Sequence, residues 1–336
     1  MTERLQRVRR ADSIDLVDRT APLRFGVIGG TSMVARLAVI PAIMASDLAE
    51  LSMVASRTPE AIAGVGEAQI TSDYADVLGD PEVDAVYIPL PNGLHRPWVE
   101  RAAAAGKHVL VEKPMALTAA DAEAMVAASV DASVVLMEAY MSPFHARNVA
   151  LADLVASGRL GELRTGRAVF SFVHRDPTDH RWDPDLGGGA LADVGIYVLT
   201  PLFDVAGSDL VHHEIRSVRT QRGVDATTTG LLSFANGFSA TFVASMELPE
   251  RQRLELVGTE GAIAVDRPFT AGTDDTVIEL TGTDGAVEHL EIDGNDSYRS
   301  MIDHFCSVVA GRSTLRRPTA LSVGFARLLE ATRTST

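Results

Sequence analysis

The sequence predicts an α/β protein with two domains: a doubly wound parallel sheet on the N-terminal side, then an α+β domain with a large, mostly antiparallel sheet. Three observations lead to this prediction. Strand-like and helix-like stretches alternate from residue 23 to about residue 140, which is the order that parallel βαβ units require. A pair of glycines separates the first strand from the first helix. Beyond residue 140, strand-like stretches follow one another without helices between them, as in antiparallel sheets.

Composition and charge exclude several classes of protein. The chain has 336 residues, 46% of them hydrophobic, which is enough for two domains with a core each. A formal net charge of −15 argues against a nucleic-acid partner, because such proteins need clustered lysines and arginines. The single cysteine, Cys306, allows no internal disulfide and no multi-cysteine zinc site.

The chain also lacks the patterns of membrane insertion and secretion. No apolar run approaches the roughly 20 residues that a membrane-spanning helix needs. Residues 1–22 have mixed charge and lack the apolar core of a secretory signal. We therefore expect a frayed N-terminal extension at 1–22, no membrane partner and a cytoplasmic location.

The first half alternates regularly between strands and helices. A short apolar strand, Leu23–Ile28, leads through the glycine pair to a helical stretch that ends near Ser46. The later elements expected here are a strand at 51–55, a helix at 73–78, a strand at 83–89, a helix at 94–105, a strand at 107–111, a helix at 119–129 and a strand at 133–137.

The glycine turn has the chemistry of a dinucleotide site. A helix N-terminus offers free N–H groups and a positive dipole end to a pyrophosphate, and only small residues let the ligand approach. The match to the Rossmann glycine pattern is incomplete, since threonine or serine stands where the second glycine is expected; a tight turn without a ligand is the alternative. The candidate cofactor-binding residues are Gly29, Gly30, Thr31, Ser32 and Met33.

The end of the second strand selects the dinucleotide. A Rossmann unit binds the ribose there, and an acidic residue at this point favours NAD. This chain carries Ser56 and Arg57 instead. The guanidinium can pair with a 2′-phosphate, and the serine can bond a hydroxyl or a phosphate oxygen. We therefore expect a preference for NADP(H), with NAD(H) as the alternative cofactor; a solvated loop arginine is the other interpretation of Arg57.

The second half combines strands with a few helices. One helix is expected from 187 to 203, after a triple glycine, and others at 144–157, 298–310 and 320–332. The expected strands are 165–173, 215–219, 228–234, 238–244, 253–257 and 277–280. The expected domains are a dinucleotide-binding domain at 23–140 and a substrate-binding and oligomerisation domain at 141–336, whose last helix can pack back on the first.

The stretch Val-Glu-Lys-Pro at 111–114 lies where the first domain ends. A residue before proline is pushed into extended geometry, so Glu112 and Lys113 should project to opposite sides of a strand end. In an open α/β sheet the ligand crevice lies beyond the carboxyl ends of the strands, which is where Lys113 is expected. A solvated Lys-Pro turn is the alternative.

Four motifs stand in one order along residues 23–328: Gly29–Ala35, Leu90–His95, Gly106–Pro114 and Gly187–Tyr197. Their order and spacing resemble those of the GFO/IDH/MocA family of NAD(P)-dependent oxidoreductases, whose members act largely on sugars, inositols and related polyols. The most similar branch contains dimeric dihydrodiol dehydrogenases, xylose dehydrogenases and nucleotide-sugar 3-ketoreductases, which also have tyrosine at the position of Tyr197.

The resemblance implies roles for residues in these motifs. Lys113 would lie beside the nicotinamide and the substrate, with a cis bond to Pro114, and Asp193 would lie near the substrate. The loop at 91–95 would line the nicotinamide pocket. The cofactor-binding candidates from the second and third motifs are Pro91, Asn92, His95, Glu112 and Lys113.

Hydride transfer requires the protein to align the carbinol carbon and to move a proton on and off its oxygen. Tyr197 is our candidate for that proton. A free phenol has a pKa of about 10, and a neighbouring ammonium such as that of Lys113 favours the phenolate. Asp193 lies four residues earlier on the same expected helix face, where it would orient Lys113 or accept a substrate hydroxyl. A core tyrosine is the alternative.

The remaining polar candidates are weaker. Arg181 and Trp182 precede the triple glycine and are candidate substrate-binding residues, because they can clamp a sugar or a phosphate; support of a lid is the alternative. His180 is a further candidate for the proton. His212 and His213 are adjacent on an expected strand, so their side chains face opposite ways and cannot chelate one ion. We expect no metal site.

The sequence thus predicts an oxidoreductase that interconverts a secondary hydroxyl and a ketone on a sugar or sugar-like polyol, with nucleotide-linked keto-sugars among the candidates. Two alternatives remain: a redox-neutral lyase or hydrolase that reuses bound NAD on a glycoside, and a non-catalytic nucleotide-binding sensor. The strands at 228–234 and 238–244 carry apolar residues on both faces, so we also expect a homodimer or homotetramer.

Overall fold

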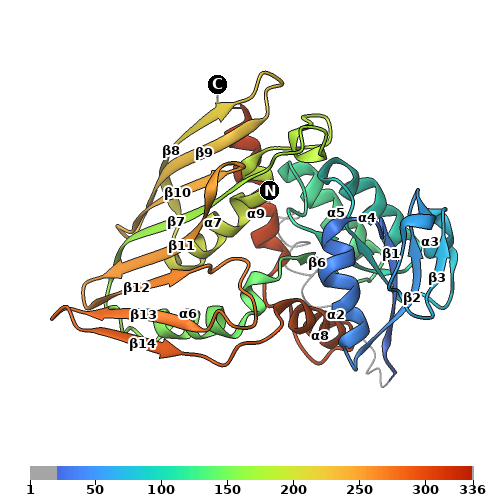
Figure 1. Ribbon diagram of the computed structural model, residues 1–336, viewed down its shortest axis with the longest axis horizontal. Helices are drawn as coiled ribbons and strands as arrows, with labels where there is room; N and C mark the ends of the chain where they lie inside the picture. The colour runs from blue at the N-terminus through green and yellow to red at the C-terminus, as the bar shows by residue number, and fades with distance from the viewer. Residues whose placement is uncertain (1–20, 335–336) are drawn as a thin grey trace. The chain divides into compact units, whose positions relative to one another are not determined.

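The computed structural model describes residues 21–334, which form two units (Figure 1). One unit contains the residues up to Tyr140 together with those from Tyr298 on, and the other is Met141–Ser297. The expected boundary after residue 140 coincides with this division, and the residues from 298 on, which include the helix expected to pack back, lie in the first unit. The expected extension at 1–22 lies outside the described residues, except for its last two positions.

The first unit contains a six-stranded sheet in the order β3-β2-β1-β4-β5-β6. All neighbouring strands are parallel, and this order is that of dinucleotide-binding doubly wound sheets. The expected Rossmann sheet is confirmed, and the short edge strand β3 is an addition. The strands are β1 (Leu23–Ile28), β2 (Ala49–Ala55), β3 (Gln69–Thr71), β4 (Ala85–Ile88), β5 (His108–Glu112) and β6 (Leu136–Ala139).

Helices connect these strands, and two more follow the second unit in the chain. Helix α9 contacts α5 and β6, while the Phe305 ring of α8 lies 5.7 Å from the Phe25 ring of β1. These apolar contacts explain why the C-terminal segment belongs to the first unit. The helical elements are η1 (Ala35–Val39, a π-helical turn), α2 (Ile40–Ala45), η2 (Pro59–Ala61), α3 (Tyr74–Gly79), η3 (Asn92–Leu94), α4 (His95–Ala104), α5 (Ala119–Asp131), α8 (Ser297–Val309) and α9 (Thr319–Thr334).

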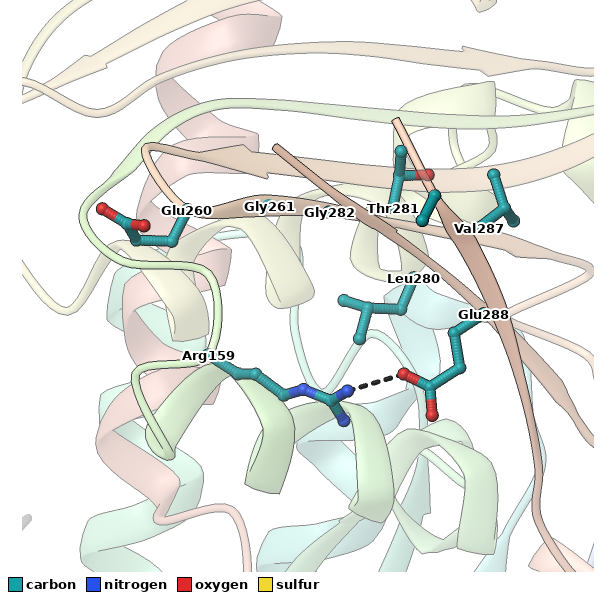
Figure 2. Close-up of a pocket in the computed structure, with 9 residues that line it drawn as sticks. Arg159, Glu260, Gly261, Leu280, Thr281, Gly282, Val287 and Glu288 are labelled. Carbon is teal, nitrogen blue, oxygen red and sulfur yellow. Dashed lines mark hydrogen bonds and ion pairs between the residues drawn. The ribbon is translucent and has the colours of Figure 1, made fainter. Parts of the chain in front are cut away.

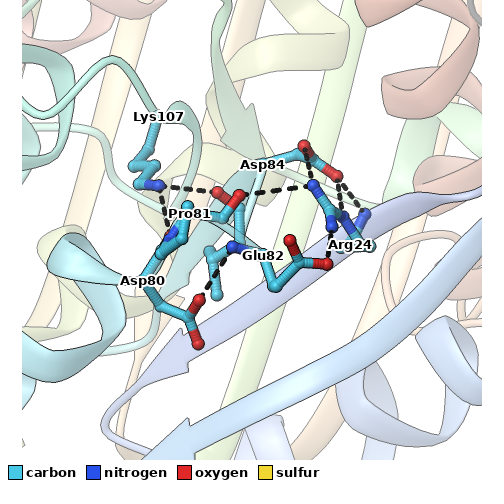
Figure 3. A network of polar contacts seen from close by, with 7 residues as sticks. Arg24, Asp80, Pro81, Glu82, Asp84 and Lys107 are labelled. Atoms are coloured by element: carbon cyan, nitrogen blue, oxygen red, sulfur yellow. Dashed lines mark hydrogen bonds and ion pairs between the residues drawn. The ribbon is translucent and has the colours of Figure 1, made fainter.

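A polar network holds the amino edge of this sheet together (Figure 3). Arg24 donates from Nε and Nη2 to the two carboxylate oxygens of Asp84 over 2.8 and 3.0 Å. The buried Lys107 donates from Nζ to the backbone oxygens of Asp80 and Val83, both at 2.7 Å, and its burial lowers its pKa. The starts of β1, β4 and β5 are thereby linked, at the edge opposite to that where such sheets bind ligands.

The second unit is built on an eight-stranded sheet in the order β14-β13-β12-β11-β7-β10-β9-β8. Its neighbouring strands are antiparallel except for β7 with β10, which confirms the expected mostly antiparallel sheet. Strands β12 and β14 were not among those expected. The strands are β7 (Leu163–Val173), β8 (Leu210–Arg219), β9 (Asp225–Phe234), β10 (Ser239–Ser245), β11 (Glu247–Gly258), β12 (Gly261–Asp266), β13 (Val277–Gly282) and β14 (Val287–Glu291).

One face of the large sheet packs against a helix. Helix α7 (Ala190–Ala206) contacts β7, β9 and β10, and the side chains of Phe242 and Leu254 are buried on that face. The opposite face carries a mixture of side chains, with Leu231 40% exposed beside the exposed Thr241 and Arg167. The other helical elements of this unit are η4 (Ser142–Phe144), α6 (Ala146–Ala156) and η5 (His180–Trp182).

Within residues 21–334, no helix has both the length and the apolar character needed to cross a membrane.

Candidate active site

The candidate cofactor-binding residues all lie at or just beyond the carboxyl ends of strands in the parallel sheet. Residues 29–33 follow β1, residues 56–57 follow β2, residues 91–95 follow β4, and residues 112–113 end and follow β5. The carboxyl ends of parallel strands meet at one edge, so the fold brings these segments together where such sheets bind ligands.

The glycine turn packs tightly against the second strand. Gly29 has a φ of +105°, and the N–H groups of Gly29 and Gly30 both donate to the backbone oxygen of Ala55 at 2.9 Å. The glycine N–H groups are therefore already used. Among the described contacts, the N–H groups of Thr31 and Met33 have no acceptor, and they remain available to a pyrophosphate at the start of the helix.

The two residues after β2 differ in their surroundings. Ser56 is only 2% exposed, and its hydroxyl lies 2.9 Å from that of Thr31 and accepts the Thr58 N–H over 3.2 Å. This contact positions Thr31 in the glycine turn. Arg57 is exposed, and within residues 21–334 it has no hydrogen-bond or ion-pair partner, so its guanidinium is available to an anion.

His95 contacts the backbone of two segments at this edge. Its side chain is fully buried. Its Nε2 lies 2.8 Å from the Leu90 backbone oxygen, and its Nδ1 lies 3.0 and 3.2 Å from those of Pro114 and Met115. Burial lowers the pKa of His95. The His95 ring thereby joins the loop after β4 to the segment after β5.

Glu112 is likewise a support for its neighbour. It is 8% exposed; its Oε1 accepts the Tyr87 hydroxyl over 2.7 Å and its Oε2 accepts the Lys113 N–H over 3.1 Å. Burial raises the pKa of Glu112, against the opposing effect of the Lys113 ammonium. The carboxylate therefore holds the backbone of Lys113. The bond from Lys113 to Pro114 is cis, as the resemblance implied.

In the second unit, helix α7 carries Asp193 in its first turn and Tyr197 one turn later. Arg181 donates from Nε to Asp193 Oδ2 over 3.0 Å. It also donates from its backbone N–H to Asp179 over 2.8 Å. The described partner of Asp193 is thus an arginine of the same unit, which places a half-buried ion pair at the start of α7.

The other candidates of this loop surround the same arginine. His180 lies with Nδ1 3.2 Å from the Asp179 carboxylate, and burial, reinforced by Arg181, lowers its pKa. Trp182 is half-buried, with its ring 6.2 Å from that of His174. The loop therefore gathers an indole, two imidazoles and a guanidinium, which are groups that bind sugars and phosphates.

The triple glycine allows this loop to approach α7 closely. A Cβ added at Gly188 would lie 2.3 Å from the Arg181 backbone oxygen, and one at Gly189 would lie 2.1 Å from Asp225 Oδ1. Gly189 also has a φ of +132°, which side-chain-bearing residues rarely adopt. A larger residue at Gly188 would displace the Arg181 backbone, and one at Gly189 would displace the Asp225 side chain.

Tyr197 lies in an aromatic cluster. It is 6% exposed, and its ring centroid lies 5.3 Å from that of Phe170 and 6.2 Å from that of Phe269. Its hydroxyl donates to the sulfur of Met141 over 3.7 Å, and thioether sulfur is a weak acceptor. The ring is thus held rigidly, while this contact binds the hydroxyl only weakly.

A hollow of about 240 Å³ lies elsewhere in the second unit, between β12, β13, β14 and the segment after α6 (Figure 2). Arg159 donates to Glu288 across it over 2.6 Å. It contains none of the candidate site residues, so it gives no support for a substrate site. In the part of the chain from 21 to 334, no group of three His, Cys, Asp or Glu side chains is placed to hold a metal ion.

Two buried carboxylates were not predicted from the sequence, and both hydrogen-bond backbone groups near the candidate residues. Glu138 is 6% exposed at the end of β6, and Asp225 is 8% exposed at the start of β9. Glu138 had a signal in the sequence, because a single carboxylate within the apolar stretch at 134–139 has to find buried partners. Asp225 stands among threonines and had no comparable signal.

Comparison with known proteins shows the family to which the chain belongs. Residues 23–140 match the family model described as oxidoreductase family, NAD-binding Rossmann fold, and residues 149–264 match the GFO/IDH/MocA C-terminal domain. The chain belongs to the GFO/IDH/MocA family of oxidoreductases.

Three members of this family illustrate what the chain is similar to. The D-xylose 1-dehydrogenase (NADP(+)) 2 of Haloferax volcanii is 37% identical over 316 residues, 92% of this chain and 96% of the relative. The dTDP-3,4-didehydro-2,6-dideoxy-alpha-D-glucose 3-reductase of Saccharopolyspora spinosa is 35% identical and covers 84% of this chain and 86% of its own. A 3-ketoreductase from Actinomadura kijaniata, solved with NADP and TDP-benzene, has a TM-score of 0.85 and 31% identity over 93% of this chain and 97% of that chain.

Proposed function

We propose that this oxidoreductase uses NADP(H) to interconvert a secondary hydroxyl and a ketone on a sugar or sugar-like polyol. The observation that carries the proposal is the held backbone of Lys113 at the ligand edge of a dinucleotide-binding sheet: Glu112 accepts its N–H over 3.1 Å, and His95 lies 3.0 Å from the carbonyl of the next residue. A lysine whose backbone is held at this edge can bring an ammonium to the oxygen of a carbonyl substrate.

The residues at this edge fit a bound dinucleotide. The N–H groups of Thr31 and Met33 would hold the pyrophosphate, and Arg57 would pair with the 2′-phosphate. When bound, the nicotinamide supplies or accepts the hydride. The NADP named in the solved ketoreductase complex and in the xylose dehydrogenase supports this choice of cofactor.

The second unit would supply the proton and part of the substrate site. Tyr197 Oη would give a proton to the substrate oxygen during reduction and take it back during oxidation. Lys113 would favour the phenolate by its charge. The Arg181–Asp193 pair would bind substrate hydroxyls, with Trp182 against the sugar face. Solved forms of the ketoreductase include variants of one tyrosine and of one lysine, two residue types that this proposal also uses.

The substrate is proposed only as a class. Relatives named for D-xylose and for a dTDP-linked keto-sugar favour a carbohydrate over other alcohols. A nucleotide-linked keto-sugar is our first choice, because the relatives include a reductase named for a dTDP-linked keto-sugar and a 3-ketoreductase solved with TDP-benzene. Cytoplasmic location is also proposed, and recovery of the protein with the cell envelope after fractionation would contradict it.

The test is the absorbance of reduced nicotinamide during incubation with a panel of free and nucleotide-linked keto-sugars. A steady loss of NADPH that depends on the sugar supports the proposal. Product formation without any net change of nicotinamide would indicate a redox-neutral lyase or hydrolase. Binding of NADPH and a sugar without any product would indicate a sensor.

A further inference from the structure

Glu138 forms a buried network next to Lys113. Its side chain is 3% exposed. Its Oε1 accepts the backbone N–H of Met115 over 2.7 Å, and its Oε2 accepts the Ser322 hydroxyl over 2.6 Å. Glu138 lies in β6, where strand pairing places it beside Val111 of β5. The carboxylate therefore reaches the chain two residues beyond Lys113.

The C-terminal segment compensates the charge of this carboxylate. Arg317 pairs with Glu138 Oε2, donates to Ser322 over 2.8 Å and lies with its guanidinium carbon 5.8 Å from the centre of the Tyr140 ring. The Arg317 side chain is 13% exposed. A buried carboxylate with three donors is fixed in place, because loss of one partner leaves an uncompensated charge.

Together with this network, side chains contact the N–H and carbonyl groups of the backbone at and just after Lys113. Glu112 accepts the Lys113 N–H, and Glu138 accepts the Met115 N–H. The His95 ring lies within hydrogen-bond distance of the two carbonyls of residues 114 and 115. Three side chains from three separate elements thus fix this segment.

We propose that Glu138, anchored by Arg317, is a positioning residue for Lys113. The expected effect on kcat rests on the proposed function, whereas the effect on the position of Lys113 does not. The backbone position of Lys113 sets the region that its ammonium can reach on a flexible four-carbon side chain. A displacement of about 1 Å at a reacting group can cost about 10²-fold in rate.

Two paired variants separate the hydrogen bond to Met115 from the ion pair. Glu138→Gln with Arg317→Met removes both charges but keeps an acceptor for the Met115 N–H. Glu138→Met with Arg317→Met removes the acceptor as well, at almost the same side-chain volume. Replacing both members of a buried ion pair is often tolerated, whereas removing one is not.

We expect the Gln pair to keep kcat close to that of the wild type. The Met pair should lose about 10²-fold in kcat with an unchanged dissociation constant for NADPH. In the Lys113→Ala background the two pairs should have the same kcat, because Glu138 then has nothing to position. Equal kcat values for the two pairs with Lys113 present would overturn the proposal. The same would follow if the Met pair remained about 10²-fold slower than the Gln pair in the Lys113→Ala background.

A second readout needs no turnover. Lys107 and Lys113 are the only lysines in the chain, so protein made with isotope-labelled lysine gives two side-chain signals in an NMR spectrum. Lys107 lies at the opposite, amino edge of the sheet and serves as an internal reference. The Met pair should shift the Lys113 signal and weaken its response to added NADP⁺, while the Lys107 signal stays in place.

An unchanged Lys113 signal in the Met pair would contradict the positioning role, whatever the enzyme's substrate. A wild type that reduces no sugar would contradict the proposed function but would leave this NMR result decisive. Should the Met pair fail to fold by circular dichroism, Glu138→Asp provides the same test. The shorter carboxylate stays charged but cannot reach both Arg317 and the Met115 N–H, so it should shift the Lys113 signal in the same way.

Discussion

Asp225 Oδ2 accepts the backbone N–H of Leu191 over 2.8 Å, which ties the start of helix α7 to the start of strand β9. The same oxygen accepts the Thr228 hydroxyl over 2.8 Å. A carboxylate at a helix N-terminus satisfies a free N–H group and interacts favourably with the helix dipole. Because α7 carries Asp193 and Tyr197, this contact anchors the helix that presents both candidates.

We expect Asp225→Ala to lower the free energy of unfolding by about 1–3 kcal/mol, since it leaves two buried donors without an acceptor. Asp225→Asn keeps one oxygen and should cost clearly less. Burial raises the pKa of Asp225, so the neutral amide suits this position. Urea denaturation of both variants measures the difference, and equal losses would show that the Leu191 contact does not anchor the helix.

Stability should fall as pH drops through the titration of His304. Its Nε2 accepts the Arg316 N–H over 3.0 Å, and burial together with Arg316 lowers its pKa from 6.5 to about 4. The unfolded chain therefore binds more protons between pH 4 and 6.5, so the stabilisation is complete above that window and is lost below it. For a half-exposed group the loss should be about 1–2 kcal/mol after solvent screening.

The measurement is urea denaturation of wild type and His304→Asn at several pH values. The wild type should lose stability relative to the variant as the pH falls. A constant difference between the two proteins would show that His304 titrates normally in the folded state.

Arg57→Ala should weaken NADPH binding by about tenfold to a hundredfold, the scale of one charge-assisted contact of roughly 1.5–3 kcal/mol. NADH binding should be almost unchanged, because its ribose lacks the phosphate. Nicotinamide fluorescence gives both dissociation constants. Arg36, which is exposed on the neighbouring helix, provides a control. Equal losses for the two cofactors, or a wild type that prefers NADH, would mean that selectivity arises elsewhere.

The exposed face of the large sheet leads us to expect a homodimer or homotetramer. Leu231 is 40% exposed in β9, which lies between β10 and the edge strand β8, whereas Val287 is 54% exposed on the other edge strand, β14. Leu231→Glu should therefore shift the assembly towards monomer, and Val287→Glu should leave it intact. Light scattering at micromolar concentration measures both, and a monomeric wild type would refute this expectation.

The parallel half of the fold could be predicted because its strands are apolar and its helices regular. Strand β14 was missed because its residues are mostly polar, and β12 because it is short and directly follows β11. The position of the last two helices depends on contacts between distant residues, such as Phe25 with Phe305. Amphipathic periodicity predicts a helix but does not identify the surface against which the helix packs.

The candidate site, too, could be predicted only in part. Motifs predicted candidate residues, and the candidate segments after β1, β2, β4 and β5 do lie at the expected edge of the parallel sheet. Their burial and partners could not be predicted: His95 and Ser56 are enclosed, and Asp193 pairs with Arg181. Each of these facts depends on side chains from other elements, which a local motif does not contain.

The central claim is that Tyr197 and Lys113 act as one unit on the substrate proton. The most direct test is kcat for NADPH oxidation by Lys113→Ala, Tyr197→Phe and the double variant, with Tyr74→Phe as a control for loss of a hydroxyl elsewhere. Each single variant should lose about 10² to 10⁴ in kcat with cofactor binding intact, and the double variant should be little worse than either. Near-normal kcat in Tyr197→Phe, or losses that multiply in the double variant, would contradict the account and leave Tyr197 as a core residue beside Phe170.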